Sequence, residues 1–141
     1  MPVKKAGLSI YSHIYTALLD VVPDLLIIEA SGKSVVPGYM DLNLDILDRC
    51  PERFVIALSH YYKHPSGDTI ADPDMEIAVY PKRGMAEALA YQDSWGYRRV
   101  YDDDFTRVNI KAKRELNTFL RQWLRNLMMQ GHKITIPLAP V

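Results

Sequence analysis

Apolar residues near both ends of the chain recur at spacings of three and four. They are Leu8, Tyr11, Ile14, Tyr15, Leu18, Leu19 and Val22 in the first stretch, and Leu116, Phe119, Leu120, Trp123, Leu124, Leu127 and Met128 in the last. This period places each set on one face of an α-helix. Pro23 ends the first helix, and Asn109 and Gly131 suit the two caps of the second. We therefore predict helices over residues 8–22 and about 110–130.

Between the two helices the pattern changes to an alternation of apolar and polar residues. Apolar residues alternate with polar ones from Met40 to Ile46, and again from Met75 to Tyr80. An apolar face opposite a polar one is typical of a strand that covers a core on one side only. The expected strands are residues 40–46, 53–63, 75–80 and 85–92. The short turn segments between them predict an antiparallel meander.

Three further segments carry weaker patterns. Residues 25–29 favour a short strand or an extended arm, residues 64–74 form a Gly- and Asp-rich loop, and residues 95–106 have no clear period. In the last strand we expect two faces, with Ala86, Ala88 and Ala90 on one and Glu87, Leu89 and Tyr91 on the other. Helices and strands do not alternate, which indicates the α+β class. We predict a single domain over residues 1–141, an antiparallel meander sheet of about four strands covered on one face by both helices.

Composition and charge narrow the class of protein. The chain has 141 residues, of which 48% are hydrophobic and 24% charged, and these values exclude a disordered chain. Cys50 is the only cysteine, so no internal disulfide can form, and we expect a cytoplasmic protein. The most apolar window, residues 17–28, contains Asp20, Pro23 and Asp24. We therefore expect neither a targeting segment nor a membrane span.

The balance of 17 Lys and Arg against 17 Asp and Glu conceals a segregation along the chain. Residues 71–104 hold four basic and eight acidic side chains, whereas residues 105–141 hold seven basic and one acidic. We expect the acidic sheet region and the basic final helix to compensate each other within the fold. Four of the basic residues form one stripe of that helix, which could instead bind phosphates of a nucleic acid. They are Lys111, Arg114, Arg121 and Arg125.

The segment from Trp95 to Tyr101 combines aromatic side chains with two adjacent arginines. Flat aromatic surface next to bidentate donors suits an anionic or ring-bearing partner. The alternative is that the aromatics pack on the second face of the sheet and the arginines pair with residues 102–104. With sheet residues expected nearby, the candidate binding residues are Tyr80, Glu87, Tyr91, Trp95, Tyr97, Arg98, Arg99 and Tyr101.

Two clusters resemble metal ligands, but neither has a suitable spacing. His60 and His64 lie four residues apart in or beside a strand, which separates them by about 13 Å, and we expect no metal site with Asp68, Asp72 and Asp74. Residues 102–104 are three consecutive aspartates without the spacing of an EF-hand, and we expect them to complement the dipole of the final helix. No catalytic motif is present, so no catalytic residue and no cofactor is assigned.

A family resemblance runs through the second half of the chain. It rests on Met75–Tyr80, Ala86-Glu87, Tyr91-Gln92, the segment Tyr97-Arg98-Arg99-Val100-Tyr101, the helix motif Asn117-x-Phe119-Leu120-x-x-Trp123-Leu124, and Gly131. In this combination and order the chain resembles a bacterial family of unknown function typified by the YqiB protein of Escherichia coli. The resemblance implies a bacterial origin and carries no established activity, so it assigns no catalytic residue.

These observations favour a small non-enzymatic binding or protein-interaction module. The expected partner is a protein or a small anionic ligand, with a second copy of the chain as one option, and no membrane is expected. The first alternative is an enzyme that acts on a small anionic metabolite. The second is weak nucleic-acid binding through the basic C-terminal helix.

Overall fold

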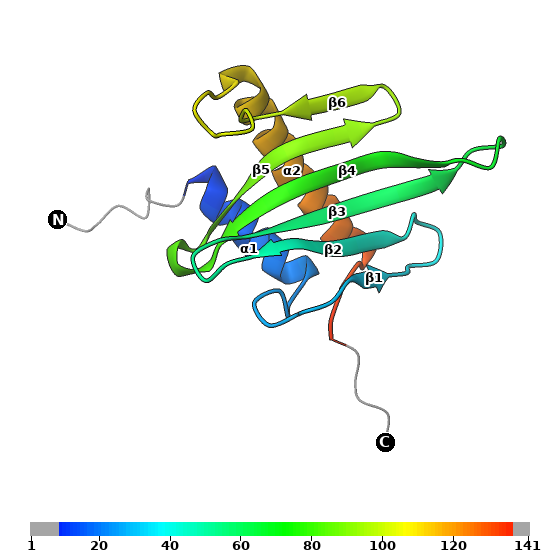
Figure 1. Ribbon diagram of the computed structural model, residues 1–141. Coiled ribbons are helices and arrows are strands. Elements are labelled where there is room, and N and C mark those ends of the chain that lie inside the picture. Colours follow the sequence, from blue (N-terminus) through cyan, green and yellow to red (C-terminus); the bar gives the residue numbers. More distant parts are fainter. Residues whose placement is uncertain (1–8, 137–141) are drawn as a thin grey trace.

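Six antiparallel strands form one sheet, and both helices lie against the same face of it (Figure 1). The computed structural model describes residues 9–136. The elements in chain order are α1 (Ile10–Val21), β1 (Gly32–Ser34), β2 (Leu42–Arg49), β3 (Phe54–Lys63), β4 (Thr69–Tyr80), the 3-10 helix η2 (Pro81–Arg83), β5 (Met85–Asp93), β6 (Gly96–Arg99) and α2 (Ile110–Gln130). The strands lie in the sheet in the same order. The predicted α+β class and antiparallel meander are confirmed.

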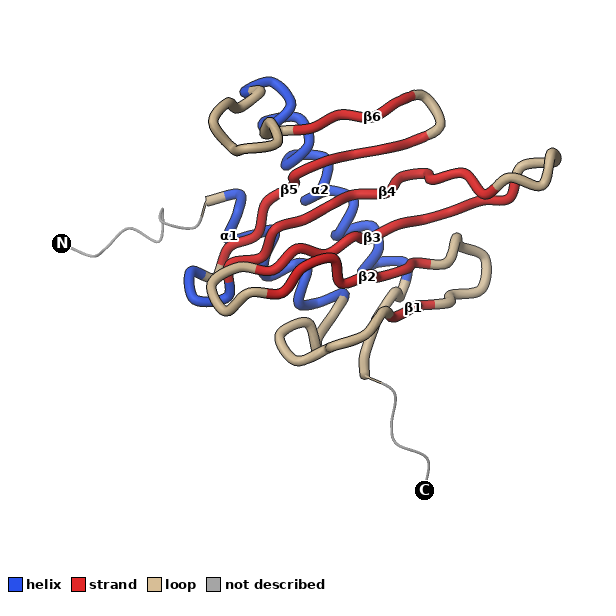
Figure 2. Tube along the Cα trace, in the orientation of Figure 1, coloured by secondary structure: helices blue, strands red, loops and turns tan. Residues whose placement is uncertain are grey.

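The strand register divides the side chains between a core face and an open face. The core row runs across five strands through Leu44, Leu58, Met75, Tyr91 and Arg98. Two rows lie on the open face; row A is Asp45, Ala57, Glu76, Ala90 and Arg99, and row B is Asn43, Ser59, Asp74, Gln92 and Tyr97. The helices cover only the core face, as the tube in Figure 2 also shows. The open face therefore carries most of the sheet's polar side chains.

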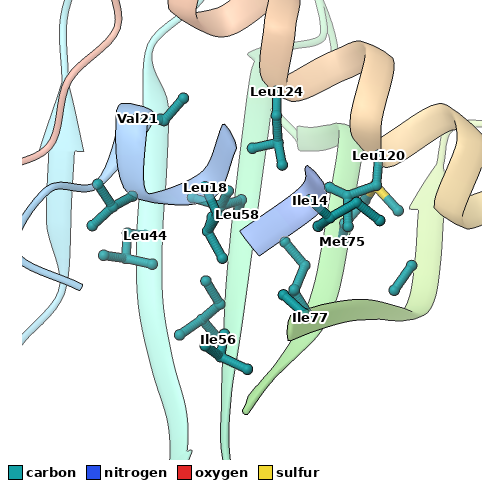
Figure 3. Close-up of a cluster of buried hydrophobic side chains, with 14 of the residues drawn as sticks. Ile14, Leu18, Val21, Leu44, Ile56, Leu58, Met75, Ile77, Leu120 and Leu124 are labelled. Carbon is teal, nitrogen blue, oxygen red and sulfur yellow. The ribbon is translucent and has the colours of Figure 1, made fainter. Parts of the chain in front are cut away.

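The hydrophobic core lies between the sheet and the two helices. Figure 3 shows side chains of both helices meeting those of the central strands. Among the fully buried residues are Ile14 and Leu18 of α1, Ile56, Leu58, Met75 and Ile77 of the sheet, and Leu120 and Leu124 of α2. Each such side chain contributes about 1.5–3 kcal/mol by leaving water. This burial fixes the order of the layers.

The sheet has six strands, and the prediction of about four is wrong in number. The two added strands are the outermost ones, β1 with three residues and β6 with four. Strands of this length are too short to show an alternation in the sequence, and every residue of β6 is exposed. β4 also begins at Thr69, inside the predicted 64–74 loop, because Thr69, Ile70 and Ala71 pair with the end of β3.

A bulge in β5 overturns the two faces predicted for that strand. Ala88 pairs with Ile77, but Ala90 pairs with the preceding residue, Glu76, so that Leu89 is an extra residue. A bulge moves all later side chains to the other face. Ala90 therefore lies on the open face, and Tyr91 lies on the core face, where its ring meets that of Phe119 edge-on.

Both predicted caps of α2 are present. The side chain of Asn109 accepts a hydrogen bond from the backbone N–H of Ala112 over 3.0 Å, and Gly131 takes a φ of 94°, which suits glycine. Trp123 is 7% exposed and Leu127 is fully buried, as expected of anchors. Phe119, which belongs to the apolar face expected for this helix, is 38% exposed and lies at the margin of the core.

The chain after α2 returns to the first edge of the sheet beside β1. The Ser34 hydroxyl lies 2.9 Å from Nδ1 of His132 and accepts a bond from the backbone N–H of Lys133. The backbone N–H of Ile134 donates to the carbonyl of Val21, which joins this segment to the end of α1. Residues 25–27 belong to a turn and residues 28 and 29 have no regular structure, so the predicted short strand does not form. Among the described residues, no helix is both long and apolar enough to cross a lipid bilayer.

Candidate functional site

Glu87 lies at the centre of a hydrogen-bonded cluster where β4 and β5 adjoin the helices. Tyr80 donates its phenol O–H to one carboxylate oxygen over 2.7 Å, and Tyr101 donates its own to the other. Lys113 of α2 then donates its ammonium group to the phenol oxygen of Tyr101 over 3.1 Å. Three of the residues predicted from the sequence therefore converge here, together with a lysine that the sequence analysis did not single out.

The cavity beside this Glu87 cluster is small. It has a volume of about 150 Å³ and is lined by Tyr11, Tyr80, Met85, Ala86, Glu87 and Lys113. The ammonium of Lys113 lies 5.6 Å from the ring centre of Tyr11 and 5.4 Å from that of Tyr101. Small-molecule sites usually measure about 300–1,000 Å³. The cluster therefore joins α1, α2 and the sheet more readily than it accommodates a metabolite.

The ionisable groups around Glu87 all hold their protons at neutral pH. Burial, together with the hydrogen bond to Glu87, raises the pKa of Tyr80 to about 12. Burial and the same carboxylate raise the pKa of Tyr101, and the hydrogen bond to Tyr101 raises the pKa of Lys113. A general acid or base works best with a pKa near the working pH. These three shifts move the groups away from that range.

The two arginines of the 95–101 segment point to opposite faces of the sheet. Arg98 belongs to the core row and pairs with Glu115 of α2 over 3.0 Å. Arg99 belongs to row A and pairs with Asp103 over 2.6 Å. The predicted pairing of the arginines with residues 102–104 is thus observed for Arg99 and replaced by a helix contact for Arg98. Both guanidinium groups already have a carboxylate partner.

The remaining predicted residues lie on the β5–β6 hairpin. Trp95 is at its tip and is 93% exposed, and Tyr97 is 52% exposed on the open face. Tyr91 lies on the core face and donates its phenol O–H to Asp93 over 2.9 Å. Asp93 in turn accepts hydrogen bonds from the backbone of Trp95 and Gly96, which shapes the turn. The predicted binding residues thus divide between the Glu87 cluster, the core face and the hairpin.

A shallow trough runs across the open face beside the hairpin. It has a volume of about 200 Å³ and lies between rows A and B, with Ala57 and Ala90 at its floor and Tyr97 at one end. Glu76 and Asp74 line it and, with burial as the larger cause, raise the pKa of Tyr97. The trough exists because the small side chains of Ala57 and Ala90 lie between larger polar side chains.

The residues considered for a metal site are dispersed. His60 is buried on the core face near Trp123, whereas His64 lies in the exposed β3–β4 loop against Ser66. Within residues 9–136, no group of three or more His, Cys, Asp or Glu side chains is placed to hold a metal ion.

The acidic run 102–104 shapes a loop. Asp102 accepts hydrogen bonds from the backbone N–H groups of Thr106 and Arg107, and Asp104 accepts one from the hydroxyl of Thr106. α2 begins later, at Ile110, and its first turn holds no acidic residue. The predicted role of this run at the helix dipole is therefore wrong. The loop instead folds back so that Phe105, with a φ of 60°, stacks on the ring of Tyr101.

The basic stripe of α2 lies on the outer side of the helix, away from the sheet. Leu120 and Leu124 face the core, whereas Lys111, Arg114 and Arg125 are exposed and Arg121 is half-buried. None of these four takes part in an ion pair with the described residues. The acidic side chains of rows A and B are on the opposite side of the sheet. The expected compensation of an acidic sheet by a basic helix is therefore wrong for these four residues, and the ion pair that does join the sheet to α2, Arg98 with Glu115, has the basic residue on the sheet and the acidic one on the helix.

A comparison with known families agrees with the extent of this fold. Residues 13–133, which include all six strands and nearly all of both helices, match the model of a family described as Domain of unknown function (DUF6908). The chain belongs to this family. No curated protein and no solved structure matches it. The match does not address the YqiB-type relatives or a bacterial source, which stay predictions.

A further cavity of this DUF6908 protein is larger than the two described above and contains none of the candidate binding residues named from the sequence. We call it the β2-edge groove; it has a volume of about 750 Å³ and is lined by residues 27–33, Asn43, Leu44, Asp45, Tyr61, Thr135 and Ile136. The sequence feature that could have indicated this groove is the apolar run of residues 25–28. Only Leu25 and Ile28 of that run are buried, and Leu26 and Ile27 remain exposed.

Proposed function

We propose that this DUF6908 protein is a non-enzymatic interaction module that binds a partner protein through its β5–β6 hairpin. The binding surface, called here the hairpin surface, consists of Trp95, Tyr97 and Arg99 with the adjoining trough on the open face. The single observation that carries the proposal is the exposure of Trp95, at 93%. Exposed tryptophan, tyrosine and arginine side chains supply most of the binding energy in protein interfaces.

The position of the hairpin supports this proposal. β6 is the last strand of the sheet, so no further strand pairs with its outer side among the described residues. Tyr97 and Arg99 project from it onto the face that neither helix covers. Asp93 holds the turn through two backbone hydrogen bonds, so Trp95 is presented on a fixed support. A partner that covers Trp95 would remove a large aromatic surface from water without first ordering the turn.

The geometry of the Glu87 cluster does not favour the enzyme alternative. An enzyme for a small anionic metabolite would need a deep cavity in which a carboxylate lies beside a cation such as Arg98 or Arg99. Glu87 is paired with two phenols instead, its cavity measures about 150 Å³, and both arginines are bonded elsewhere. In an interaction module this cluster would only need to connect the hairpin to the helices.

The test compares three forms of the full chain as immobilised bait in an extract of the cells from which it comes. They are the wild type, a Trp95→Ala/Tyr97→Ala variant, and a Tyr39→Ala/Tyr62→Ala control that removes exposed aromatics outside the hairpin surface. We expect the hairpin variant alone to lose the retained partner, or to change oligomeric state if the partner is a second copy. The proposal fails if all three forms retain the same proteins and have the same mass in solution.

A second candidate function, binding of an anionic polymer, is favoured by one observation on α2. The stripe of Lys111, Arg114, Arg121 and Arg125 has no ion-pair partner among residues 9–136. Phosphate binding through such a stripe releases counterions, so the affinity for a nucleic-acid duplex should fall steeply between about 50 and 200 mM salt. Equal retention of duplex by wild type and an Arg114→Gln/Arg125→Gln variant would rule this function out.

A further inference from the structure

The β2-edge groove lies at the edge of the sheet opposite the hairpin, and it combines features that the proposed function does not use. Its volume of about 750 Å³ falls in the range of ligand sites. One wall is the irregular segment that leads into β1, and the other is formed by Asn43 and Asp45 of β2 with Tyr61 of β3. Figure 1 shows that segment running below the second half of β2, near the end of the described chain.

The outer edge of β2 is only partly paired. β1 pairs with Leu42, Asn43 and Leu44, and no other described strand lies outside residues 45–48 of β2. The segment opposite is tied to the end of β2 by Arg49, whose guanidinium donates to the carbonyls of Leu26 and Ile28. A strand edge without a neighbour presents backbone donors and acceptors that an extended peptide can satisfy. The groove therefore opens where the sheet can accept a further strand segment.

The apolar side chains of the groove lie partly in water. Ile27 is 66% exposed and Ile136 is 39% exposed, and both line the groove together with the buried Ile28 and Leu44. Aliphatic side chains gathered at the rim of a cavity mark a site of association more often than scattered ones do. These aliphatic side chains would be removed from water by contact with aliphatic side chains of a ligand, so they favour such a ligand.

The charges of the groove favour a cationic ligand. Glu29 and Asp45 line it, and neither takes part in an ion pair with the described residues. The lysine of the lining, Lys33, is already paired with Asp41 over 3.2 Å. Charge complementarity therefore points to a basic segment of a partner protein.

We propose that the β2-edge groove binds an extended segment of a partner protein in which aliphatic side chains alternate with lysine or arginine. The backbone of the segment pairs with the free edge of β2 beyond Leu44. Its aliphatic side chains rest on Ile27, Ile28 and Ile136, and its cations face Glu29 and Asp45. Asp45 is the one lining residue that the groove shares with the trough of the hairpin surface, so a Glu29→Gln single variant, which leaves that trough unchanged, tests the groove separately.

The experiment uses three synthetic probes and the full chain labelled with ¹⁵N. The first probe is a fluorescent six-residue peptide of alternating lysine and valine, the second is the same peptide with N-methylated amides, and the third is spermidine. We expect the first probe to bind saturably and to shift the amide signals of Asp45 and its neighbours. The N-methylated peptide cannot donate to the strand edge, so it should bind at least about 5-fold more weakly.

Two charge variants complete the test. Glu29→Gln/Asp45→Asn removes the carboxylates of the groove, and Glu52→Gln/Asp68→Asn removes the same charge from exposed positions outside it. The groove variant should weaken peptide binding by about 5-fold, as two exposed ion pairs would, and the control should not. The proposal is overturned if the peptide fails to bind at 1 mM, if the N-methylated peptide or spermidine binds equally well, or if the shifts map to the hairpin.

Discussion

At the scale of single residues, Glu87 explains why Tyr80 and Tyr101 stand at the positions they occupy. Each phenol satisfies one oxygen of the same carboxylate, and the three side chains connect β4, β5 and the segment that follows β6. From the sequence these residues could be recognised as a group, but their role could not. The spacing of seven residues between Tyr80 and Glu87 spans a tight hairpin, whereas Tyr101 reaches the cluster only because β6 returns along β5.

Replacing Glu87 by Gln should destabilise the fold and alter the titration of Tyr80. A glutamine side chain can accept only one of the two phenol bonds with its oxygen, so we expect a loss of about 1–2 kcal/mol in urea unfolding. The pKa of Tyr80, about 12 in the native protein, should fall because the carboxylate is gone, while burial keeps it above its ordinary value of 10.0. Tyrosine ¹³Cζ shifts followed against pH measure this change. An unaltered Tyr80 titration would contradict the assigned geometry.

Asn117 is a buried residue in the middle of α2. The sequence showed it as part of the helix motif of the family resemblance, without indicating what its side chain binds. Its side-chain oxygen accepts the backbone N–H of Ala88 over 2.8 Å, and its NH₂ donates to the carbonyl of Lys113. Asn117→Ala leaves the buried N–H of Ala88 without a partner, which should cost about 1–3 kcal/mol. Asn126→Ala, on the exposed side of the same helix, should change stability by less than about 0.5 kcal/mol. Equal effects of the two changes would disprove the bond to β5.

At the scale of elements, α2 is the part of the fold that the sequence predicted best. Its apolar period repeats from Leu116 to Met128, over about three and a half turns, and its two caps are polar or glycine residues with specific local roles. β1 and β6 could not be predicted, because strands of three and four residues contain no full pattern and are formed by pairing with a longer neighbour. The bulge at Leu89 was equally hidden, since it depends on the register against β4.

Trp123 should be the most costly position of α2 to truncate. Its ring stacks on Phe119 and meets His60 edge-on, and only 7% of the residue is exposed. Trp123→Ala should lower the free energy of unfolding by about 3–5 kcal/mol. Phe119→Ala should cost clearly less, because that ring is partly in water. A loss below about 1 kcal/mol for Trp123→Ala would mean that the helix packs in another way.

The segment after α2 should loosen in mild acid because of His132. This side chain is buried, its Nδ1 contacts Ser34, and its Nε2 has no hydrogen-bond partner. Burial, with the nearby His60 as a smaller cause, lowers the pKa of His132 below its ordinary value of 6.5, against the opposing influences of the Met40 backbone and of Asp41. Between that lowered pKa and 6.5 the unfolded chain binds more protons than the folded one. Stability is therefore complete above pH 6.5 and falls as the pH drops below it.

Urea unfolding at pH 7.5 and 5.0 measures this contribution of His132. His132→Asn cannot be protonated in this range, so the wild type should lose more stability between the two pH values than this variant does. His13→Gln, an exposed change on α1, should keep the pH dependence of the wild type. The assignment is wrong if His132→Asn and the wild type lose the same stability.

At the scale of the whole molecule, the charges are distributed between opposite sides. The carboxylates of rows A and B lie on the open face, and the basic stripe lies on the far side of α2. The sequence revealed the segregation of charge along the chain, but not its direction in space. Two patches of opposite sign that cannot reach each other are available to partners, which fits an interaction module.

The candidate site was only partly predictable for the same reason. The exposed aromatics of the hairpin stood out as residue types, and three residues of the Glu87 cluster were named correctly as neighbours. The division of Arg98 and Arg99 between two faces follows from strand alternation once β6 exists, and β6 itself has no sequence signal. The β2-edge groove is formed by residues 27–33 and 135–136, which lie beside the edge of β2. Such an arrangement of segments far apart in the sequence has no local sequence pattern.

The central claim, that a partner covers the hairpin surface, is tested most directly by the fluorescence of Trp95. In a Trp123→Phe variant Trp95 is the one remaining tryptophan, because the chain has two. In the isolated protein its emission should be that of a water-exposed indole. On addition of the partner retained by the immobilised chain, or on self-association, the emission should shift to shorter wavelength and become protected from iodide quenching. Unchanged emission and quenching in the complex would contradict the account.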